Sequence, residues 1–595
     1  MGELRSEEVI AEFDRLTRNA AAVQLETLWR ILDANAGVEY LQRHGLAGRT
    51  DPDAFRACVP VATHDDLEPY IRRVADDGDT SAVLTAKPVT SISLSSGTTQ
   101  GKRKYLPFND ELAKLTMHEQ VTPCMVVSLT VSDGDAPTND RTAPYLFDPA
   151  FPVDDGKSLQ FVYGSRQLTA KGGLTATTAT TNLYRNKEYK AAVRDIQLPC
   201  CSPDEVIFAP DFTESLYCHL LCGLLAAGEV RLVFSMFGHN LALAFDTLQH
   251  VWQDLCRDIR RGGAPSPARV TDPAVRRAVP DPDLADEVAR RCAALAGDGW
   301  YGVFPALWPN AKYVHTIVTG SMEHYVKKLR HYAGGLPVVA MDYGASEGMV
   351  GANVEPEMPP ESATFAVLPN VAYFEFIPLK TINDVAACPD ATSYAAAEPV
   401  GLTEVTVGEH YEVVMTTFAG DVVKVTGFYN STPKLKFVCR GILTLSINVD
   451  KNSEQDVQLA INRATKVLAA KRLEVMEYTS YADVSSDPGH YVIFWELNNA
   501  EGNNDDGVLQ SYCDELDRGF VDAGYVSSRK TNGIGPLELR VVRPSTFQKV
   551  MEHYLSLGAP VNQFKLPRCV AESNSSVLRI LSSHTIKVLF STAYE

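Results

Sequence analysis

Positive charge is scarce in this chain of 595 residues. Lys and Arg total 55 against 74 Asp and Glu, which leaves a formal net charge of -19. Binding to nucleic acids and to anionic membrane surfaces depends on basic side chains that displace counterions from phosphates. We therefore expect no nucleic-acid partner and no membrane partner. The composition favours a function that involves small molecules.

Long apolar runs and paired cysteine motifs are also missing. Without a run of about 18 apolar residues the sequence predicts no membrane-spanning helix. The twelve cysteines lack the repeated spacing of a disulfide framework or a zinc site, so we expect free thiols and a cytoplasmic location. Cys218 and Cys222 flank His219, but all three lie in an apolar helical run, which favours core packing over a metal site.

The length of the chain predicts more than one domain. From about residue 85 to 341, strand-like and helix-like segments alternate, which indicates an α/β domain. Turn-forming residues at 427–433 lie between two β-like runs and are interpreted as a hinge. We therefore expect a large N-terminal α/β domain at 1–426, a hinge at 427–439, and a smaller, mobile α+β domain at 440–595.

The most informative stretch is the loop at 94–102, with the sequence LSSGTTQGK, directly after a strand-like segment. Its glycines permit close approach and its hydroxyls add donors, so its backbone is suited to cradle phosphate oxygens. It lacks the spacing of a Walker loop, which argues against a P-loop NTPase. A plain polar turn is the alternative reading of the loop on its own.

A second motif, DYGASEG at 342–348, also follows a β-like run. The ring of Tyr343 is positioned to stack on an adenine, and Glu347 to hold Mg²⁺ beside the phosphates. A third element, Gly420-Asp421, offers a carboxylate to both ribose hydroxyls. For both elements the alternative is a solvated turn.

Two lysines of the C-terminal region, Lys530 and Lys565, are candidate catalytic residues. A lysine delivered by a mobile domain neutralises charge that develops on a phosphate. The alternative is that both lysines only solvate the surface.

Three regions, at 94–101, 343–348 and 427–440, resemble the signature regions of the plant Gretchen Hagen acyl-acid amido synthetases, which belong to the adenylate-forming superfamily. The similarity continues at 201–206, 310–314, 328–334, 487–491 and 537–541. Within the family, residues 95–101 together with Leu106, Pro107 and Phe108 are most similar to the jasmonate-amido synthetases.

The resemblance implies an ATP-dependent ligase. The N-terminal domain would hold ATP, Mg²⁺ and a jasmonate-like acid, convert the carboxylate to an acyl-AMP, and pass the acyl group to an amino acid, isoleucine first among them. The C-terminal domain would swing between the two half-reactions. Prearranged N–H groups, hydroxyls, Mg²⁺ and a lysine suit this chemistry because both steps gather negative charge on oxygen.

The resemblance also implies site residues by motif position. Lys530 and Lys565 are the catalytic lysines, and Glu347 is the metal ligand. The ATP side comprises Ser96, Gly97, Thr98, Thr116, Asn182, Tyr343, Gly344, Ala345, Ser346, Glu347, Gly348, Asp421 and Lys565. The side of the acyl acid and the amino acid comprises Thr99, Thr180, Tyr184, Phe234, Met341, Met349 and Lys530. Taken without the family, residues 233–237 are more typical of a core strand than of a pocket.

The chain departs from the family pattern in three places. A short segment that the family carries before Asp421 is missing, an extra segment interrupts a helix near 121–140, and Met341 and Met349 replace the usual His and Trp. These differences keep other hypotheses open: the same chemistry on indole-acetate or a benzoate, a homologue that only binds ligand, and an acyl-CoA ligase.

Overall fold

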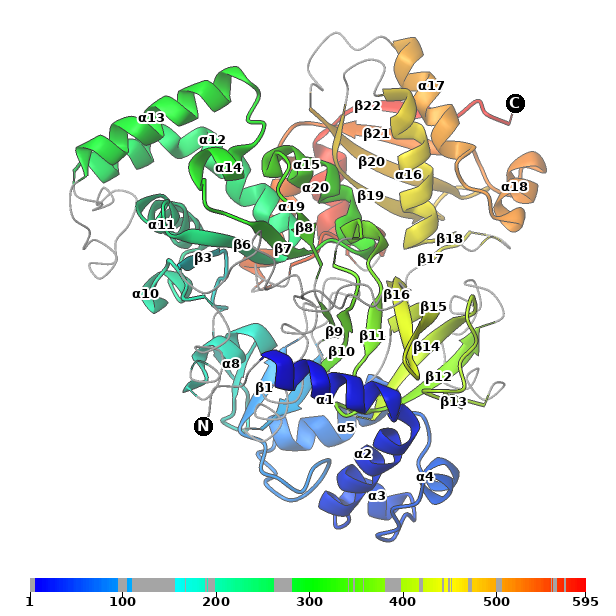
Figure 1. Cartoon of the computed structure of the whole chain (residues 1–595). Coiled ribbons are helices and arrows are strands. Elements are labelled where there is room, and N and C mark those ends of the chain that lie inside the picture. The colour runs from blue at the N-terminus through cyan, green and yellow to red at the C-terminus, as the bar shows by residue number, and fades with distance from the viewer. Residues whose placement is uncertain are drawn as a thin grey trace, which may run out of the picture.

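The computed structural model describes most of the chain and confirms the α/β class. The described residues are 6–94, 104–109, 156–165, 167–187, 190, 198–261, 281–340, 342–345, 348–356, 358–379, 398–416, 421–440, 444–447, 450, 452–468, 474–498, 506–557, 559, 564–571 and 574–594. Figure 1 shows a lower part built from the first helices and an antiparallel sheet, and an upper part that contains a parallel sheet and the C-terminal domain.

The chain begins with amphipathic helices, as the spacing of apolar residues at 7–46 predicts. They are α1 (Ser6–Arg18), α2 (Ala20–Ala34), α3 (Glu39–Arg43), α4 (Pro52–Cys58) and α5 (His64–Ala75). Helix α2 packs on the sheet strand β12 (Tyr373–Leu379) through buried Gln24, whose side chain donates to the carbonyls of Pro369 and Ala372 and accepts from the N–H of Phe374. Gln24 thus makes three of the hydrogen bonds that hold the first helices to the central sheet.

Replacing Gln24 by leucine should lower the free energy of unfolding by about 2 kcal/mol. The change leaves buried backbone groups without their partner, and an unpaired buried group costs about 1–3 kcal/mol. Urea unfolding followed by circular dichroism measures the loss. The exposed Gln548 bonds to Glu552 on the same helix, so Gln548→Ala should stay within about 0.5 kcal/mol of the parent. Equal stability of the two variants would contradict the prediction.

A parallel sheet and its helices form the upper part of the N-terminal domain. The strand order is β3 (Lys157–Gln160), β6 (Val230–Phe237), β7 (Tyr313–Ile317) and β8 (Val338–Val339), all parallel. The helices that accompany it are α10 (Asp204–Ile207), α11 (Phe212–Leu225), α12 (Gly238–Arg260), α13 (Pro282–Gly297), α14 (Val303–Leu307), the 3-10 helix η3 (Gly320–Tyr325) and α15 (Val326–Ala333).

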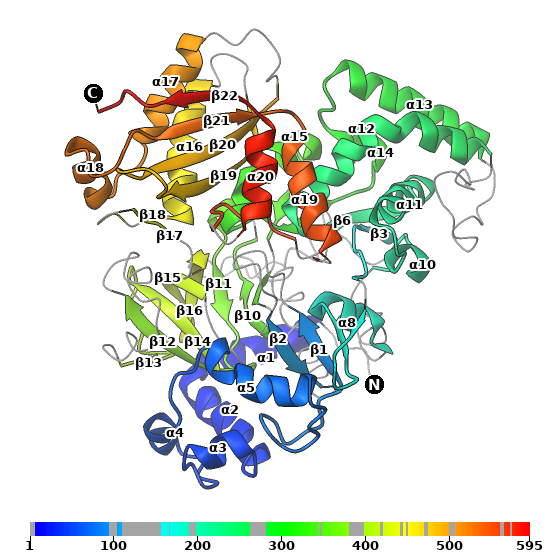
Figure 2. The same ribbon diagram turned by 180° about the vertical axis from the view of Figure 1, so that it is seen from behind.

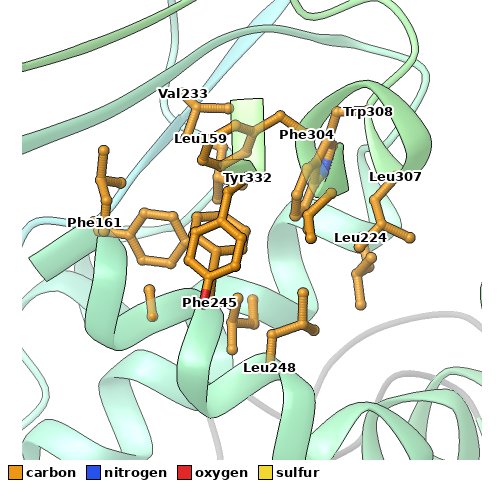
Figure 3. Close-up of a cluster of buried hydrophobic side chains, with 14 of the residues drawn as sticks. Leu159, Phe161, Leu224, Val233, Phe245, Leu248, Phe304, Leu307, Trp308 and Tyr332 are labelled. Atoms are coloured by element: carbon orange, nitrogen blue, oxygen red, sulfur yellow. The ribbon is translucent and has the colours of Figure 1, made fainter. Parts of the chain in front are cut away.

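The core of this part lies between the sheet and its helices (Figure 3). The ring of Phe245 on α12 is in edge contact with Phe304 at 4.5 Å and with Trp308 at 5.8 Å between centroids. The indole N–H of Trp308 donates to the carbonyl of Gly223, so its polar atom is satisfied. Close packing of this kind makes the sheet a rigid platform for the strand ends described below.

A second, eight-stranded sheet carries the middle of the chain. Its order is β13 (Val400–Gly401), β12, β14 (His410–Thr416), β15 (Asp421–Tyr429), β16 (Thr432–Arg440), β11 (Phe365–Val367), β10 (Gly348–Asn353) and β9 (Asp342–Ala345). The short 3-10 helix η4 (Pro360–Ser362) precedes β11. All neighbours in it are antiparallel.

The segment expected as a hinge, 427–439, is a paired part of this sheet. Strands β15 and β16 form a hairpin whose turn contains Asn430 at a φ of 53°. The turn is fixed to α1, because the Tyr429 hydroxyl donates to Asp14 at 2.8 Å and the Asn430 amide to Thr17 at 2.8 Å. The turn formers therefore mark a hairpin. We infer that the chain changes domain after Arg440.

A small sheet next to the N-terminal helices leads into the hydroxyl-rich loop. Its order is β2 (Tyr105–Phe108), β1 (Ser91–Leu94), β5 (Thr175–Thr177) and β4 (Leu168–Thr169), with β1 and β5 parallel. Helix α8 (Ala179–Arg185) follows β5 and is capped by Thr178, whose hydroxyl accepts from the N–H of Thr181. The expected strand at 91–94 is confirmed.

The C-terminal domain is a four-stranded sheet covered by helices on both faces (Figure 2). The strand order is β19 (Val475–Asp483), β20 (His490–Leu497), β21 (Glu538–Val542) and β22 (Thr585–Phe590). One core joins α16 (Glu454–Leu468) and α17 (Asp506–Asp517) to the sheet, and another joins α19 (Thr546–Ser556) and α20 (Ser575–Ser583) to it. The other elements are β17 (Thr444–Leu445), β18 (Asn452–Ser453) and α18 (Ala523–Lys530).

Among the described residues, no helix combines the length and the apolar character that a membrane crossing requires.

Candidate functional site

A row of side chains crosses the parallel sheet at the level where β3 ends, in the C-terminal halves of the strands or at their middle. Gln160 is the last residue of β3 and stands opposite Phe234 of β6. The Tyr184 hydroxyl on α8 donates to the Gln160 side-chain oxygen at 3.3 Å. In open α/β sheets ligands bind outside these strand ends. The strand ends are therefore the natural place to look for a ligand site.

The row continues across the sheet to the second motif. The ring of Phe234 lies 4.9 Å from the ring of His315 on β7, and the Nε2 of His315 lies 3.9 Å from a carboxylate oxygen of Asp342. Asp342 is the first residue of β9, so it opens the DYGASEG motif. We call Tyr184, Gln160, Phe234, His315 and Asp342 the strand-end row. It connects the parallel sheet to the eight-stranded sheet.

Helix α8 joins the strand-end row to the strand that precedes the first motif. The Asn182 side chain donates to the Ser93 hydroxyl at 3.2 Å, one residue before the end of β1. Thr180, two residues earlier on α8, is buried. Asn182 and Tyr184 thus lie on one short helix, with Asn182 beside β1 and Tyr184 beside β3. Residues expected to contact the nucleotide and the acyl acid are brought together here.

The second motif forms two paired strands in which the aromatic ring faces the core. Tyr343 is 7% exposed, and its ring contacts Phe365 at 5.7 Å and Phe437 at 5.9 Å between centroids. The sequence predicts that the ring of Tyr343 stacks on an adenine. In this arrangement the ring is part of the core instead. A Cβ at Gly344 would lie 3.0 Å from the sulfur of Met349 on β10, so a larger residue at position 344 would make the Met349 side chain shift.

The two candidate lysines occupy different places. The Nζ of Lys565 lies 4.5 Å from the centroid of the Phe237 ring, at the end of β6 and three residues after Phe234. Lys530 is the last residue of α18 and is exposed. Both ribbon views place α18 on the outer side of the C-terminal domain, away from β6 (Figures 1 and 2). Only Lys565 faces the N-terminal domain in this arrangement.

Several expected site residues lie outside the described residues. They are Ser96, Gly97, Thr98, Thr99, Thr116, Met341, Ser346 and Glu347. For Asp421 only the backbone is described. Asp421 is the first residue of β15 and pairs with Val413. Ala345 and Gly348 pair with each other where β9 turns into β10. The assignments of these residues stay predictions.

Sequence reasoning missed two members of the row, Gln160 and His315. Both are buried polar residues in strands: Gln160 ends β3, and His315 lies in the middle of β7. A polar residue within an otherwise apolar strand was the available signal. His219, by contrast, is a core residue, because its Nδ1 bonds to the Ser202 hydroxyl and its Nε2 to the carbonyl of Val162. Burial lowers its pKa to about 4.

A second histidine, His239, lies where the two domains meet. It is the second residue of α12, and its ring is flanked by Phe237, by Tyr325 and by Phe564 of the C-terminal domain. Neither ring nitrogen has a hydrogen-bond partner among the described residues. Burial lowers its pKa to about 4; Glu477 acts in the opposite direction, while Lys565 and Arg568 lower it further.

The burial of His239 predicts that the two domains separate at acidic pH. The pKa of His239 is near 4 when its ring is buried between the domains, and about 6.5 when the ring is in water. The imidazole therefore binds a proton more tightly when the C-terminal domain moves away. Docking is therefore favoured above pH 6.5 and weakens by up to about tenfold per pH unit as the pH falls from about 6.5 to 4. Small-angle scattering at pH 7.5 and pH 5 measures the change in domain arrangement.

A matched variant separates His239 from other groups at the same interface. His324 lies half-buried at the same interface, where its Nε2 bonds to the carbonyl of Met476, and desolvation lowers its pKa as well. His239→Phe keeps the ring contacts and should remove part of the pH dependence between pH 7.5 and 5. An unchanged pH dependence in this variant would contradict the assignment to His239.

The comparisons with known proteins agree with this architecture. Family models match almost all of the chain: the GH3 family N-terminal domain at 9–338, the GH3 family central domain at 365–440 and the GH3 family C-terminal domain at 455–574. The chain belongs to the GH3 family. The expected family is thereby confirmed, and this GH3 chain is an acyl-acid amido synthetase. The central-domain match ends at the last residue of β16, which agrees with the hairpin at 427–439.

Relatives of this GH3 chain carry two kinds of name. A rice protein named "Probable indole-3-acetic acid-amido synthetase GH3.12" is 58% identical over 99% of the chain and 97% of its own length. A rice protein named "Jasmonoyl--L-amino acid synthetase GH3.5" is 54% identical over 99% of both chains. The solved structure "AtGH3.15 acyl acid amido synthetase in complex with 2,4-DB" superimposes with a TM-score of 0.84 at 31% identity, covering 100% of this chain and 98% of that one.

Proposed function

We propose that this GH3 chain uses ATP and Mg²⁺ to adenylate a jasmonate-like acid and then transfers the acyl group to an amino acid, with isoleucine as the first candidate. The observation that supports the proposal is that the strand before the first motif and the first residue of the second motif both lie next to the strand-end row or belong to it. Asn182 ties α8 to the strand before the hydroxyl-rich loop, and His315 ties β7 to Asp342 of the second motif.

The chemistry explains why this set of groups is suited to the task. A carboxylate is a poor electrophile because its charge is delocalised and an oxide ion is a poor leaving group. In the first step a carboxylate oxygen bonds to the α-phosphorus of ATP and pyrophosphate leaves. In the second step the amine nitrogen bonds to the acyl carbon, the C–O bond breaks, AMP leaves with the bonding pair, and the amine loses a proton. Both steps place charge on phosphate or carbonyl oxygens.

The residues have distinct parts in this proposal. Lys565 approaches from the C-terminal domain and supports negative charge on a phosphate. The side chain of Asn182 and the open backbone at Gly344 belong to the nucleotide side. Thr180, Tyr184, Phe234 and Met349 belong to the side of the acyl acid. Glu347 is the proposed Mg²⁺ ligand, since carboxylates suit this ion, and Asp421 the proposed ribose ligand.

Conjugation would change the level of a free acid hormone in the cytoplasm. The described part of the chain offers no membrane-crossing helix, and the cysteines it contains are free thiols, which suits a reducing compartment.

Pyrophosphate exchange tests the choice of acid. Purified protein, ATP and Mg²⁺ are combined separately with jasmonate, indole-acetate and a benzoate, and incorporation of labelled pyrophosphate into ATP is followed. Jasmonate should give the fastest exchange, and mass spectrometry should then detect jasmonoyl-isoleucine when mixed amino acids are added. Exchange with another acid but none with jasmonate would overturn the choice of substrate.

Indole-acetate is the second candidate, because the rice relative that shares 58% identity carries that name. The exchange assay separates the two acids directly. A thioester product in the presence of CoA would instead identify an acyl-CoA ligase. No exchange with any acid would favour a homologue that only binds ligand.

A further inference from the structure

A strap of the C-terminal domain carries Lys565 to the strand-end row. Its described residues are 564–571, between α19 and α20, and they form no helix or strand of their own. The strap is tied to β19 instead: the Ser480 N–H donates to the Arg568 carbonyl at 2.8 Å, and the Val570 N–H donates to the Ser480 carbonyl at 2.7 Å. The Thr479 hydroxyl also donates to the carbonyl of Pro567.

Arg568 fixes this strap against the N-terminal domain. Its side chain is 1% exposed and donates to the Glu477 carboxylate at 2.8 Å, to the Tyr478 carbonyl at 3.0 Å and to the carbonyl of Ser321 at 3.3 Å. Its guanidinium also lies 4.4 Å from the centroid of the Tyr478 ring. Ser321 belongs to η3 of the N-terminal domain, so one arginine spans the interface.

Glu477 receives a second bond from the N-terminal domain. The hydroxyl of Tyr325, the last residue of η3, donates to its carboxylate. Arg568 keeps the pKa of Glu477 below its usual range although burial opposes this. We call Tyr325, Glu477 and Arg568 the strap anchor. A buried charge pair of this kind is costly to break and specifies one arrangement.

The element that receives the anchor is itself held firmly. Gly320, the first residue of η3, has a φ of +59°, and a Cβ there would lie 2.5 Å from the ring of Phe437 on β16. The 3-10 helix therefore packs directly on the central sheet. The anchor joins the strap to a rigid part of the N-terminal domain.

Lys565 lies three residues before Arg568 on the same strap. Its position over Phe237, and that of Phe564 beside His239, follow from where Arg568 is held. Because an ammonium group stabilises charge on phosphate oxygens, this arrangement suits the adenylation step better than the attack of a neutral amine.

We propose that the strap anchor positions Lys565 for adenylation and that Glu477, Tyr325 and Arg568 are positioning residues of that half-reaction. The inference rests on the proposed function. It assigns a different requirement to each step: formation of the acyl-AMP needs the anchor, and amide formation from a preformed acyl-AMP does not.

The test compares Tyr325→Phe and Glu477→Gln with the parent in both half-reactions. Glu477→Gln should lower pyrophosphate exchange at least about tenfold, since a displacement of about 1 Å costs about a hundredfold. Tyr325→Phe keeps the ion pair and the ring and should lower it about threefold, as expected for one lost hydrogen bond to a charged group outside the reaction itself. Amide formation from added acyl-AMP should change less than about twofold in both variants.

Two further variants make the result decisive. Lys327→Ala breaks an exposed ion pair with Glu474 across the same interface and should leave both rates unchanged. The double variant Glu477→Gln/Lys565→Ala should exchange no more slowly than Lys565→Ala alone, because the anchor acts through that lysine. Additive losses, or equal losses in the two half-reactions, would overturn the inference. Absence of exchange in the parent would instead overturn the proposed function.

Discussion

Lys565→Ala should lower the rate of ATP–pyrophosphate exchange by about 10²–10³-fold. Removal of a single preorganised charge-stabilising group has this effect in other enzymes. The Nζ of Lys565 approaches the end of β6 in this arrangement. Alanine is neutral, so the variant lacks this positive charge. Exchange measured at saturating acid and ATP gives the ratio directly.

Two lysine variants control this experiment. Lys549→Ala removes an exposed lysine of α19 that bonds to His584 and should leave exchange within about twofold of the parent. Lys530→Ala reports on the lysine of α18, which lies away from the row. Loss of exchange in Lys530→Ala together with normal exchange in Lys565→Ala would reverse the assignment.

Asp517→Ala should cost the C-terminal domain about 3–5 kcal/mol of stability. The carboxylate is 0% exposed, pairs with Arg529 at 2.8 Å, and accepts from the Tyr525 hydroxyl at 2.7 Å. Removing one partner of a buried pair leaves the other charge uncompensated, and losses of about 3–5 kcal/mol follow. Hydrogen exchange of the α17 and α18 amides measures the change locally. Because α18 ends at Lys530, the same substitution should loosen that lysine.

An exposed ion pair on the same helix supplies the control. Glu515 pairs with Arg518 at 3.0 Å near the end of α17. Glu515→Ala should change the stability by less than about 1 kcal/mol, since exposed pairs contribute little. If the two substitutions had the same effect, the buried pair would be shown to contribute no more than a surface contact.

The sequence predicted the strands and helices whose pattern is local. The apolar pattern predicts a helix at 214–227 and a strand at 491–496, and the structure has α11 (Phe212–Leu225) and β20 (His490–Leu497) at these places. Apolar periodicity identifies such elements because one face must be buried. Strands precede both glycine-rich motifs, β1 (Ser91–Leu94) and β8 (Val338–Val339), as their patterns predicted; the first motif itself lies outside the described residues.

Features that depend on distant partners were beyond sequence reasoning. Turn formers at 427–433 were interpreted as a hinge because the sequence does not reveal that α1, about four hundred residues earlier, holds the turn. For Tyr343 the residue type indicated a ring available for stacking, but the register of β9 and β10 turns that ring toward Phe365. The strap anchor joins residues from both domains, and the spacing of these residues along the chain does not predict their contact.

The contact between α1 and the β15–β16 turn closes the first 430 residues into one loop. Besides the bonds of Asp14 and Thr17, the ring of Phe13 lies 5.3 Å from that of Tyr429. A fragment that stops before Tyr429 would expose Phe13 to solvent and leave the opening helix without its support. The first helix and the hairpin near residue 430 therefore fold as a single cooperative body, and synthesis must pass the hairpin before the first helix acquires its final place.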